Sequence, residues 1–385
     1  MEYRYHRNLK ISEVGVGCYA LSGAYGSVDS KQFQQMITHA FELGVNFFDT
    51  AEGYGEAEKI LGESIKPFRE EVLVATKVGI REGVKPNLSE TYVLEACQLS
   101  LEHLQTDYID LYQVHFDDPA TPVKETVSAL DSLVDEGKIR HYGVGHLPKN
   151  RVQEYCQIGE PFSILMELSA VARKSREDLL PLCGSQQVAA IGFSTTGRGI
   201  LTGKYGLETK FEPNDIRNMD PLFQRARFQS ALVVKDKFTD LARDYNKTPV
   251  QVAIAWVLAQ PNVICALTGS SKIKHLEENI GGSGWTISKK DLEQLDQFFV
   301  YEDRVLAEEE QALIRRILSE PLSMPPTQAF IDLIYVLETS HDLGLLSEQQ
   351  VRQVFQKLWP IHKSLDESSK KKLTSIQREL QTLID

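Results

Sequence analysis

Eight short apolar segments recur along the chain, and longer amphipathic segments separate them. The longer segments, for example 31–43, 89–104 and 123–136, carry apolar residues three and four positions apart, which is typical of helices that bury one face. The short segments are rich in β-branched and aromatic residues, which is typical of strands. They span residues 14–18, 45–49, 72–78, 108–115, 139–145, 162–168, 188–193 and 263–268.

Strands with nearly continuous apolar character are buried on both faces, and a parallel sheet covered by crossover helices provides that environment. Eight strand–helix units predict a (β/α)8 TIM barrel, an α/β fold. An open, doubly wound parallel sheet is the alternative. No Gly-x-Gly-x-x-Gly sequence follows an early strand, which weakens that alternative.

The predicted barrel occupies residues 1–299, and residues 300–385 form a helical C-terminal extension. A stretch rich in Lys, Arg, Asp and Pro, residues 203–230, separates the seventh strand from a helix at 232–245, and loops of this length are usually functional or mobile. The predicted helices of the extension span residues 308–318, 327–340, 347–359 and 366–384.

Two features delimit and characterise these last helices. Ser347 with Gln350 forms a capping box, and Pro360 ends that helix. The final helix carries an apolar stripe, which needs a surface to pack against. It could pack on the rest of the chain, form the interface of a homo-oligomer, or belong to a lid over the substrate. The stripe consists of Leu373, Ile376, Leu380 and Leu383.

Composition excludes several classes of protein. The formal net charge of −12 has the wrong sign for a general nucleic-acid binder. The longest apolar runs are far shorter than the roughly 20 residues of a membrane span, and the first residues contain no apolar signal-peptide core, so we expect a cytoplasmic protein. The five cysteines are scattered without zinc-ligand spacing, and no metal site is predicted.

Active sites of TIM barrels lie at the carboxyl ends of the strands, where this chain places four polar side chains. Asp49 ends the second strand, Tyr54 follows in the next loop, Lys77 lies near the end of the third strand, and His115 ends the fourth. Taken singly, Asp49 could instead cap a helix, Tyr54 could anchor a loop, and His115 could be a core histidine.

Lys77 constrains the interpretation most, because a buried ammonium without a partner costs several kcal/mol. Asp49 is the natural carboxylate for it. A phenol beside the ammonium would have a lowered pKa, which would make Tyr54 a usable general acid. His115 would then orient a substrate oxygen, and the group would suit protonation of a carbonyl oxygen while a hydride reaches the carbon.

Three segments carry a resemblance to a known family: GVNFFDTAEGYGEAEKILGESI, VLVATKVG and DYIDLYQVHFDD. Together they resemble the aldo-keto reductase superfamily, over about residues 1–299. The resemblance implies an NADP(H)-dependent oxidoreductase that reduces an aldehyde or ketone to an alcohol. In that family Tyr54 would be the acid, Lys77 and Asp49 would tune it, and His115 would position the carbonyl.

The resemblance also implies a cofactor site. The segment GFSTTGRGILTGKY is similar to the family segment that holds the nicotinamide and pyrophosphate, with Phe193 as the stacking aromatic, followed by Ser194, Gly197, Gly199, Leu201, Gly203 and Lys204. The segment LTGSSKIKHLEEN is similar to the one that binds the adenosine 2′-phosphate and adenine, through Gly269, Ser270, Lys272, His275, Glu278 and Asn279. His275 replaces the usual Arg or Gln, and NADP(H) is expected over NAD(H).

Three positions depart from the family pattern. Gly145 and His146 replace a Ser-Asn pair, and Leu165 replaces a Gln, all of which bind the nicotinamide carboxamide in the family. At roughly 0.5–1.5 kcal/mol per hydrogen bond, these changes would weaken cofactor binding by about one to three powers of ten. His146 either restores one bond or acts as an additional acid or base.

The substrate is expected to be a small carbonyl compound in a pocket walled by Tyr19, Tyr25, Phe116 and parts of 203–230. Two alternatives keep the same barrel. One is a non-redox acid–base enzyme that catalyses elimination, cyclisation or isomerisation. The other is a cofactor-binding regulatory or scaffold protein that uses the helical extension as its binding surface.

Overall fold

The computed structural model describes residues 1–80, 86–213, 215–319, 326–363 and 365, which form two compact units. The first unit contains residues 1–204 and 237–286. The second contains residues 205–236 and the described residues from 287 onward. Most of the insertion after the seventh predicted strand therefore belongs with the C-terminal helices, although residues 237–286 lie between them in the sequence.

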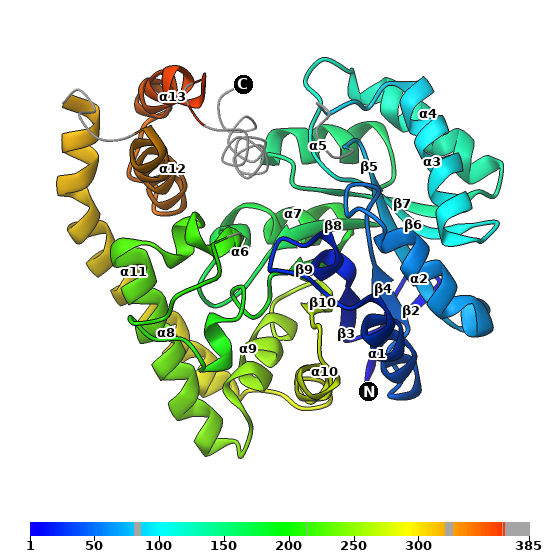
Figure 1. Ribbon diagram of the computed structural model, residues 1–385, viewed down its shortest axis with the longest axis horizontal. Helices are drawn as coiled ribbons and strands as arrows, with labels where there is room; N and C mark the ends of the chain where they lie inside the picture. Colours follow the sequence, from blue (N-terminus) through cyan, green and yellow to red (C-terminus); the bar gives the residue numbers. More distant parts are fainter. Residues whose placement is uncertain (81–85, 214, 320–325, 364, 366–385) are drawn as a thin grey trace. The chain divides into compact units, whose positions relative to one another are not determined.

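Eight parallel strands in the first unit close into a barrel in the order β10-β3-β4-β5-β6-β7-β8-β9 (Figure 1). This arrangement confirms the predicted (β/α)8 TIM barrel, and every strand overlaps one of the eight predicted segments. The strands are β3 (Val14–Gly17), β4 (Phe47–Asp49), β5 (Leu73–Val78), β6 (Ile109–Val114), β7 (Ile139–Gly145), β8 (Ser163–Glu167), β9 (Ala189–Phe193) and β10 (Val263–Gly269).

Helices follow the strands and surround the barrel, and side chains cap the first turns of α1 and α9. Asp29 Oδ1 accepts the backbone N–H of Gln32 at the start of α1, and Thr248 N donates to Gln251 Oε1 at 3.1 Å where α9 begins. The helices are η1 (Cys18–Ser22), α1 (Ser30–Glu42), α2 (Ala57–Ile65), η2 (Lys66–Glu71), α3 (Glu90–Leu104), α4 (Val123–Asp135), α5 (Lys149–Ile158), α6 (Lys174–Asp178), α7 (Leu180–Gln186), η3 (Ile200–Thr202), α9 (Pro249–Leu258) and α10 (Ile273–Ile280).

A hairpin that the sequence pattern did not reveal fills the amino-terminal end of the barrel. It consists of β1 (Tyr3–His6) and β2 (Leu9–Ser12), and its Leu9 and Ile11 belong to the apolar cluster of the barrel interior. Arg4 donates to the carbonyl of Val263, the first residue of β10, at 2.6 Å. The hairpin thus leaves the carboxyl ends of the strands for a functional site.

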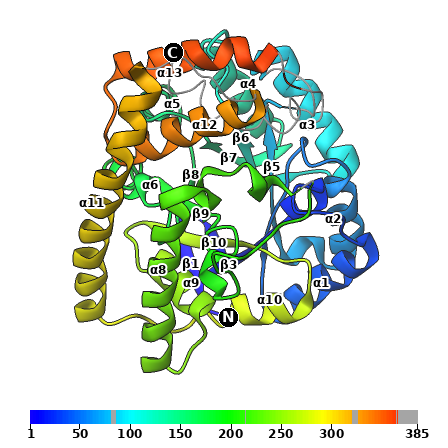
Figure 2. The same cartoon turned by 60° about the vertical axis from the view of Figure 1, so that its left-hand side comes forward.

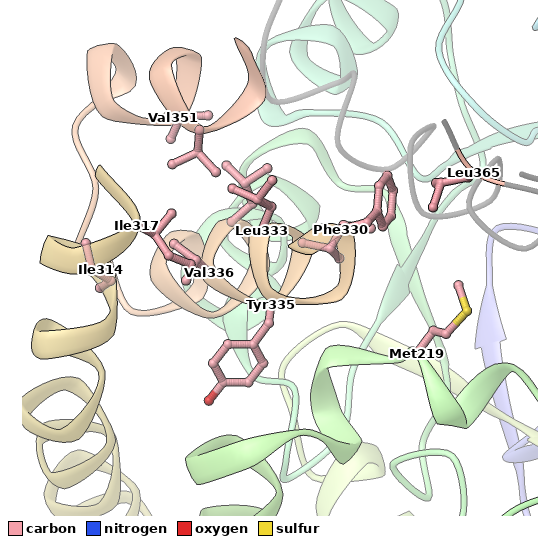
Figure 3. Packing of buried hydrophobic residues seen from close by; sticks show 12 residues of the cluster. Met219, Ile314, Ile317, Phe330, Leu333, Tyr335, Val336, Val351 and Leu365 are labelled. Atoms are coloured by element: carbon pink, nitrogen blue, oxygen red, sulfur yellow. The ribbon is translucent and has the colours of Figure 1, made fainter. Parts of the chain in front are cut away.

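The second unit has its own apolar core, formed mainly by the C-terminal helices. Its elements are η4 (Ile216–Asn218), η5 (Pro221–Phe223), the first part of α8 (Arg225–Asp244), α11 (Lys289–Ser319), α12 (Pro326–Asp342) and α13 (Glu348–Lys363). Helix α12 packs against both α11 and α13 (Figure 2). Figure 3 shows Ile317 of α11, Leu333 of α12 and Val351 of α13 in one cluster, which Met219 of the insertion joins.

Polar contacts fasten the insertion to the C-terminal helices within this unit. Arg225 Nη2 lies 2.5 Å from Asp332 Oδ1 of α12. Tyr335 Oη accepts the backbone N–H of Arg227 at 3.1 Å and donates to Glu310 Oε1 of α11 at 2.6 Å. The C-terminal helices are therefore a structural partner of residues 205–236.

The structure corrects several predicted helix boundaries. The helix expected at 308–318 is part of one continuous helix, α11, which begins at Lys289, because residues 300–307 contain no Gly or Pro to interrupt it. Helix α13 continues three residues past Pro360, so proline does not end it; the packing of the helix outweighs a cost of about 3 kcal/mol. Helix α8 begins at Arg225, inside the expected loop. The striped helix at 366–384 lies outside the described residues.

Candidate active site

A buried ion pair forms the base of the site at the carboxyl end of the barrel. Asp49 ends β4 and Lys77 lies on the adjacent strand β5. Lys77 Nζ is 2.5 Å from Asp49 Oδ1 and donates to the Thr50 carbonyl at 2.7 Å. Only 1% of Lys77 and 5% of Asp49 is exposed, so each charge depends on the other for compensation. The predicted pair is confirmed.

Gln113 completes the surroundings of this pair and was not predicted. Its Nε2 donates to Asp49 Oδ2 at 3.1 Å from strand β6. Gln113 precedes His115 by two residues, so both side chains point to the same face of the strand. An amide side chain inside the otherwise apolar segment 108–115 was the available signal.

Tyr54 and His115 lie beside the ion pair. Lys77 Nζ is 5.0 Å from the centroid of the Tyr54 ring, and the Tyr54 and His115 ring centroids are 5.6 Å apart. The backbone N–H of His115 donates to the Val78 carbonyl at 2.9 Å, which aligns the end of β6 with the end of β5. The structure therefore brings all four predicted residues, Asp49, Tyr54, Lys77 and His115, into one cluster.

The electrostatics of Tyr54 differ from the sequence-based expectation. Burial raises the pKa of Tyr54 well above its usual value, and the negative charge of Asp49 raises it further. The expected lowering by Lys77 was wrong for this arrangement, because the ammonium is already compensated by Asp49 at 2.5 Å. Burial also raises the pKa of Asp49, against the lowering effect of Lys77. Tyr54 is therefore a neutral phenol at neutral pH.

Aromatic rings from three strand ends line the site next to His115. The ring centroids of Phe116 and His146 are 4.8 Å apart, and those of His146 and Phe193 are 4.6 Å apart. The ring of His115 lies 4.5 Å from that of Phe116. This row of tilted rings provides a largely apolar wall.

Two further aromatic residues continue the cluster from Tyr54. The Tyr19 ring is 5.1 Å from the Tyr54 ring, and the Tyr25 ring is 5.7 Å from that of Tyr19. The predicted substrate residues Tyr19, Tyr25 and Phe116 thus all reach the surroundings of the four-residue cluster. The predicted contribution of residues 203–230 to the pocket remains a prediction.

His146 is a neutral imidazole rather than an additional acid or base. Burial lowers the pKa of His146 to about 3, and the positive charges of Lys77 and Arg198 contribute to this. The suggestion that His146 titrates near neutrality was therefore wrong. Its remaining predicted role is that of a hydrogen-bonding neutral side chain.

The other two departures from the family pattern are neighbours in the barrel. Gly145 of β7 pairs with Leu165 of β8, and a Cβ at position 145 would lie 3.1 Å from the Leu165 Cβ. Neither residue offers a polar side-chain atom, and Leu165 is 2% exposed. Only His146 remains as a polar side chain among these three positions.

The segment after β9 winds through a series of left-handed turns. Ser194, Gly197, Gly199 and Gly203 all have positive φ, and the N–H of Gly197 donates to the Ser194 carbonyl at 2.7 Å. A Cβ at position 197 would lie 2.4 Å from Val171 Cγ2, so only glycine fits there. Leu201 is fully buried and anchors the segment.

Glu167 and Arg198 fix this segment to strand β8, and sequence reasoning missed the pair. Arg198 Nη1 lies 3.0 Å from Glu167 Oε1, and Nη2 donates to Oε2 at 3.2 Å. This ion pair, with its hydrogen bond to Oε2, ties the turns to the sixth barrel strand. A carboxylate at the end of an apolar strand was the signal in the sequence.

The segment after β10 carries positive charge and meets the end of the β9 segment. Burial and the charges of Lys204 and Lys272 lower the pKa of His275, with a further contribution from Lys274. Several lysine side chains therefore create a positive potential around His275, and a positive potential is what attracts a phosphate group. The residues predicted for the adenosine end of a nucleotide fit an anion in this respect.

Ser270 and Asn279 are largely buried at the two ends of this segment, with 6% and 5% exposed. Ser270 Oγ donates to the Lys272 carbonyl at 2.7 Å and accepts the Lys272 N–H at 3.2 Å. The hydroxyl therefore shapes the turn before α10. Gly269 ends β10, and Glu278 and Asn279 lie on α10. Their contacts with a nucleotide stay a prediction.

No three or more His, Cys, Asp or Glu side chains in the part of the chain that the structure describes are grouped so that they could hold a metal ion. No helix formed by the described residues has the length and apolar character needed to cross a membrane.

Comparison with known proteins identifies close similarities. The model of the aldo/keto reductase family matches residues 13–299. Aldo-keto reductase YhdN of Bacillus subtilis is 33% identical over 297 residues, which cover 75% of this chain and 90% of that protein. Aldo-keto reductase yakc [NADP(+)] of Schizosaccharomyces pombe is 30% identical, covering 71% of this chain and 84% of its own. The solved structure of glycerol dehydrogenase AKR11B4 from Gluconobacter oxydans superposes with a TM-score of 0.72 at 26% identity. The superposition covers 78% of this chain and 96% of that one.

Proposed function

Because the chain belongs to the aldo/keto reductase family, we propose that it is an NADP(H)-dependent oxidoreductase that reduces an aldehyde or ketone to an alcohol. The observation that carries the proposal is the cluster of Tyr54 and His115 beside the buried Lys77–Asp49 pair. A neutral proton donor, an orienting imidazole and a fixed cation are the groups that protonation of a carbonyl oxygen requires.

Each residue of the cluster has a distinct role in the proposed reaction. His115 orients the carbonyl oxygen toward the Tyr54 hydroxyl, and Tyr54 donates its proton to that oxygen as negative charge develops there. The raised pKa keeps the Tyr54 phenol protonated at neutral pH and makes it a weaker acid, so proton transfer depends on the negative charge that develops on the more basic carbonyl oxygen. Asp49 holds Lys77 in place 5.0 Å from the Tyr54 ring, and Tyr54 regains its proton from solvent after the transfer.

The nicotinamide cofactor, when bound, supplies the hydride to the carbonyl carbon. Phe193 would stack on the ring, and the neutral imidazole of His146 would hydrogen-bond its carboxamide. The pyrophosphate would lie against the turns formed by Ser194, Gly197 and Gly199, as the family resemblance implies. The rest of the predicted segment, Leu201, Gly203 and Lys204, continues toward the adenosine end.

The choice of NADP(H) over NAD(H) rests on positive charge. Lys204 and Lys272 both act on His275, so a 2′-phosphate at this place would be attracted by several cations. The name of the Schizosaccharomyces pombe relative specifies NADP(+), which supports the same choice. Gly269, Ser270, Glu278 and Asn279 would complete the adenosine site.

Purified protein tests the proposal directly. We expect it to quench or shift NADPH fluorescence on binding and to consume NADPH with a panel of aldehydes and ketones. Tyr54→Phe should abolish turnover and leave NADPH binding intact, since the ring is retained and only the proton donor is lost. Tight binding without turnover would indicate a regulatory protein instead. Activity that survives removal of the cofactor would indicate a non-redox acid–base enzyme.

A further inference from the structure

Glu52 lies between Asp49 and Tyr54 in the sequence and contacts the end of strand β5. Its Oε1 accepts the backbone N–H groups of Gly79 at 2.8 Å and of Ile80 at 2.9 Å. Tyr92 Oη of α3 lies 3.1 Å from each of the two carboxylate oxygens. One side chain thus connects the loop after β4 with the residues that directly follow β5.

The two segments also approach each other through their backbones. A Cβ at Gly53 would lie 2.8 Å from the Ile80 carbonyl oxygen, so the chain at 53 passes directly over residue 80. The backbone N–H of Glu52 reaches the Lys77 carbonyl only at 3.5 Å. Lys77 and the Thr50 carbonyl join the two segments at the start of the loop, and the Glu52 carboxylate adds short hydrogen bonds further along the loop, closer to Tyr54.

The backbone conformation at the end of β5 determines where the Gly79 and Ile80 N–H groups meet the Glu52 carboxylate. Gly79 has φ +116°, which side-chain-bearing residues rarely adopt, and a Cβ there would lie 2.8 Å from Leu88 Cδ2. This conformation directs two successive N–H groups to one oxygen atom. Hydrogen bonds from N–H groups to a carboxylate are about twice as strong as those between neutral groups.

We propose that Glu52 is a positioning residue for Tyr54: its carboxylate ties the loop that carries Tyr54 to the end of the strand that carries Lys77. The inference rests on the proposed function for the role of Tyr54. Glu52 acts through geometry, since Asp49 is the carboxylate whose charge acts on Tyr54. Tyr54 follows Glu52 by two residues and Lys77 precedes Gly79 by two, so a shift between the loops would change the distance from the phenol to the ammonium.

Two substitutions of Glu52, with one control substitution elsewhere, distinguish a positioning role from a loss of overall stability. Glu52→Ala removes the acceptor, whereas Glu52→Gln keeps an amide oxygen for the Gly79 and Ile80 N–H groups. Asp110→Ala is the matched control: Asp110 is a fully buried carboxylate that accepts the Val74 N–H at 3.0 Å at the opposite end of the barrel. It also pairs with Arg69 and Arg140, so its loss destabilises the barrel away from the site.

Steady-state kinetics give the first readout. We expect Glu52→Ala to lower kcat by about 10- to 100-fold, since a displacement of the order of 1 Å has effects of this size. The KM for the carbonyl substrate and the Kd for NADPH should stay within about threefold of the wild type, and Glu52→Gln should stay within about threefold in kcat. If Glu52→Ala lowers kcat no more than Asp110→Ala, or if Glu52→Gln is as slow as Glu52→Ala, the proposal is wrong.

Amide hydrogen exchange gives a readout that does not depend on turnover. The Gly79 and Ile80 amides, and those of residues 50–57, should exchange at least about tenfold faster in Glu52→Ala than in the wild type and in Asp110→Ala. If the wild-type protein reduces no carbonyl compound, only the proposed function is refuted. The amide-exchange rates would still show whether Glu52 ties the two loops together. Unchanged exchange in Glu52→Ala would overturn the proposal.

Discussion

The buried pair of Lys77 and Asp49 makes a quantitative prediction for Lys77→Met, which removes the ammonium and retains an apolar side chain of similar length. The Asp49 carboxylate, 5% exposed, would keep only Gln113 as a hydrogen-bonding side chain among the contacts described above. Breaking one side of a buried pair costs about 3–5 kcal/mol of unfolding free energy, because the remaining charge is uncompensated.

The loss should depend on pH. Burial already raises the pKa of Asp49, and Lys77 is the main group that opposes this, so the pKa rises further when Lys77 is replaced. A carboxyl whose folded-state pKa exceeds its unfolded value of about 3.9 stabilises the fold below that value and loses this contribution as the pH rises through the folded-state pKa. Lys77→Met should therefore be least destabilised in acid and most destabilised at neutral and higher pH.

Urea denaturation followed by tryptophan fluorescence measures this effect, because Trp256 and Trp285 both lie in the barrel unit. The double variant Asp49→Asn/Lys77→Met should recover about 2 kcal/mol of the loss at neutral pH, since no buried charge remains. A double variant no more stable than Lys77→Met, or a loss independent of pH, would refute the reasoning.

Three further predictions follow from the structure. His146 should show no ring titration by NMR between about pH 5 and 8, since its pKa is held at about 3; a midpoint near 6 would contradict this. Lys272→Ala should weaken NADPH binding by about tenfold or more and leave NADH binding nearly unchanged, with the exposed Lys289→Ala as control; equal losses for both cofactors would exclude a 2′-phosphate contact. Truncation after Phe299 should lower solubility or change substrate range more than cofactor affinity, because it removes the partners of Met219; unchanged kinetics and oligomeric state would count against a role for residues 300–385.

Most of the barrel could be predicted because its signal is local. A strand buried on both faces needs an uninterrupted apolar segment, and all eight such segments became barrel strands. The positions of Asp49, Lys77 and His115 followed from the same pattern, since parallel strands end at one rim. The Lys77–Asp49 pair followed from the cost of burying a lone charge.

The properties of individual groups could not be predicted in the same way. The pKa values of Tyr54 and His146 depend on how much water each ring loses and on which charges face it, and both differed from expectation. Gln113 and Glu167 were overlooked because their partners, Asp49 and Arg198, lie on other elements.

The sequence by itself determined the strand and helix alternation, the residues at the strand ends and the family resemblance, because each depends on short-range periodicity or on contiguous motifs. Only the tertiary structure decided that residues 205–236 pack with the C-terminal helices, that a hairpin fills the amino-terminal end of the barrel, and that Glu52 binds the end of β5. These contacts join segments far apart in the chain, and their energies depend on burial and on distances that no local pattern encodes.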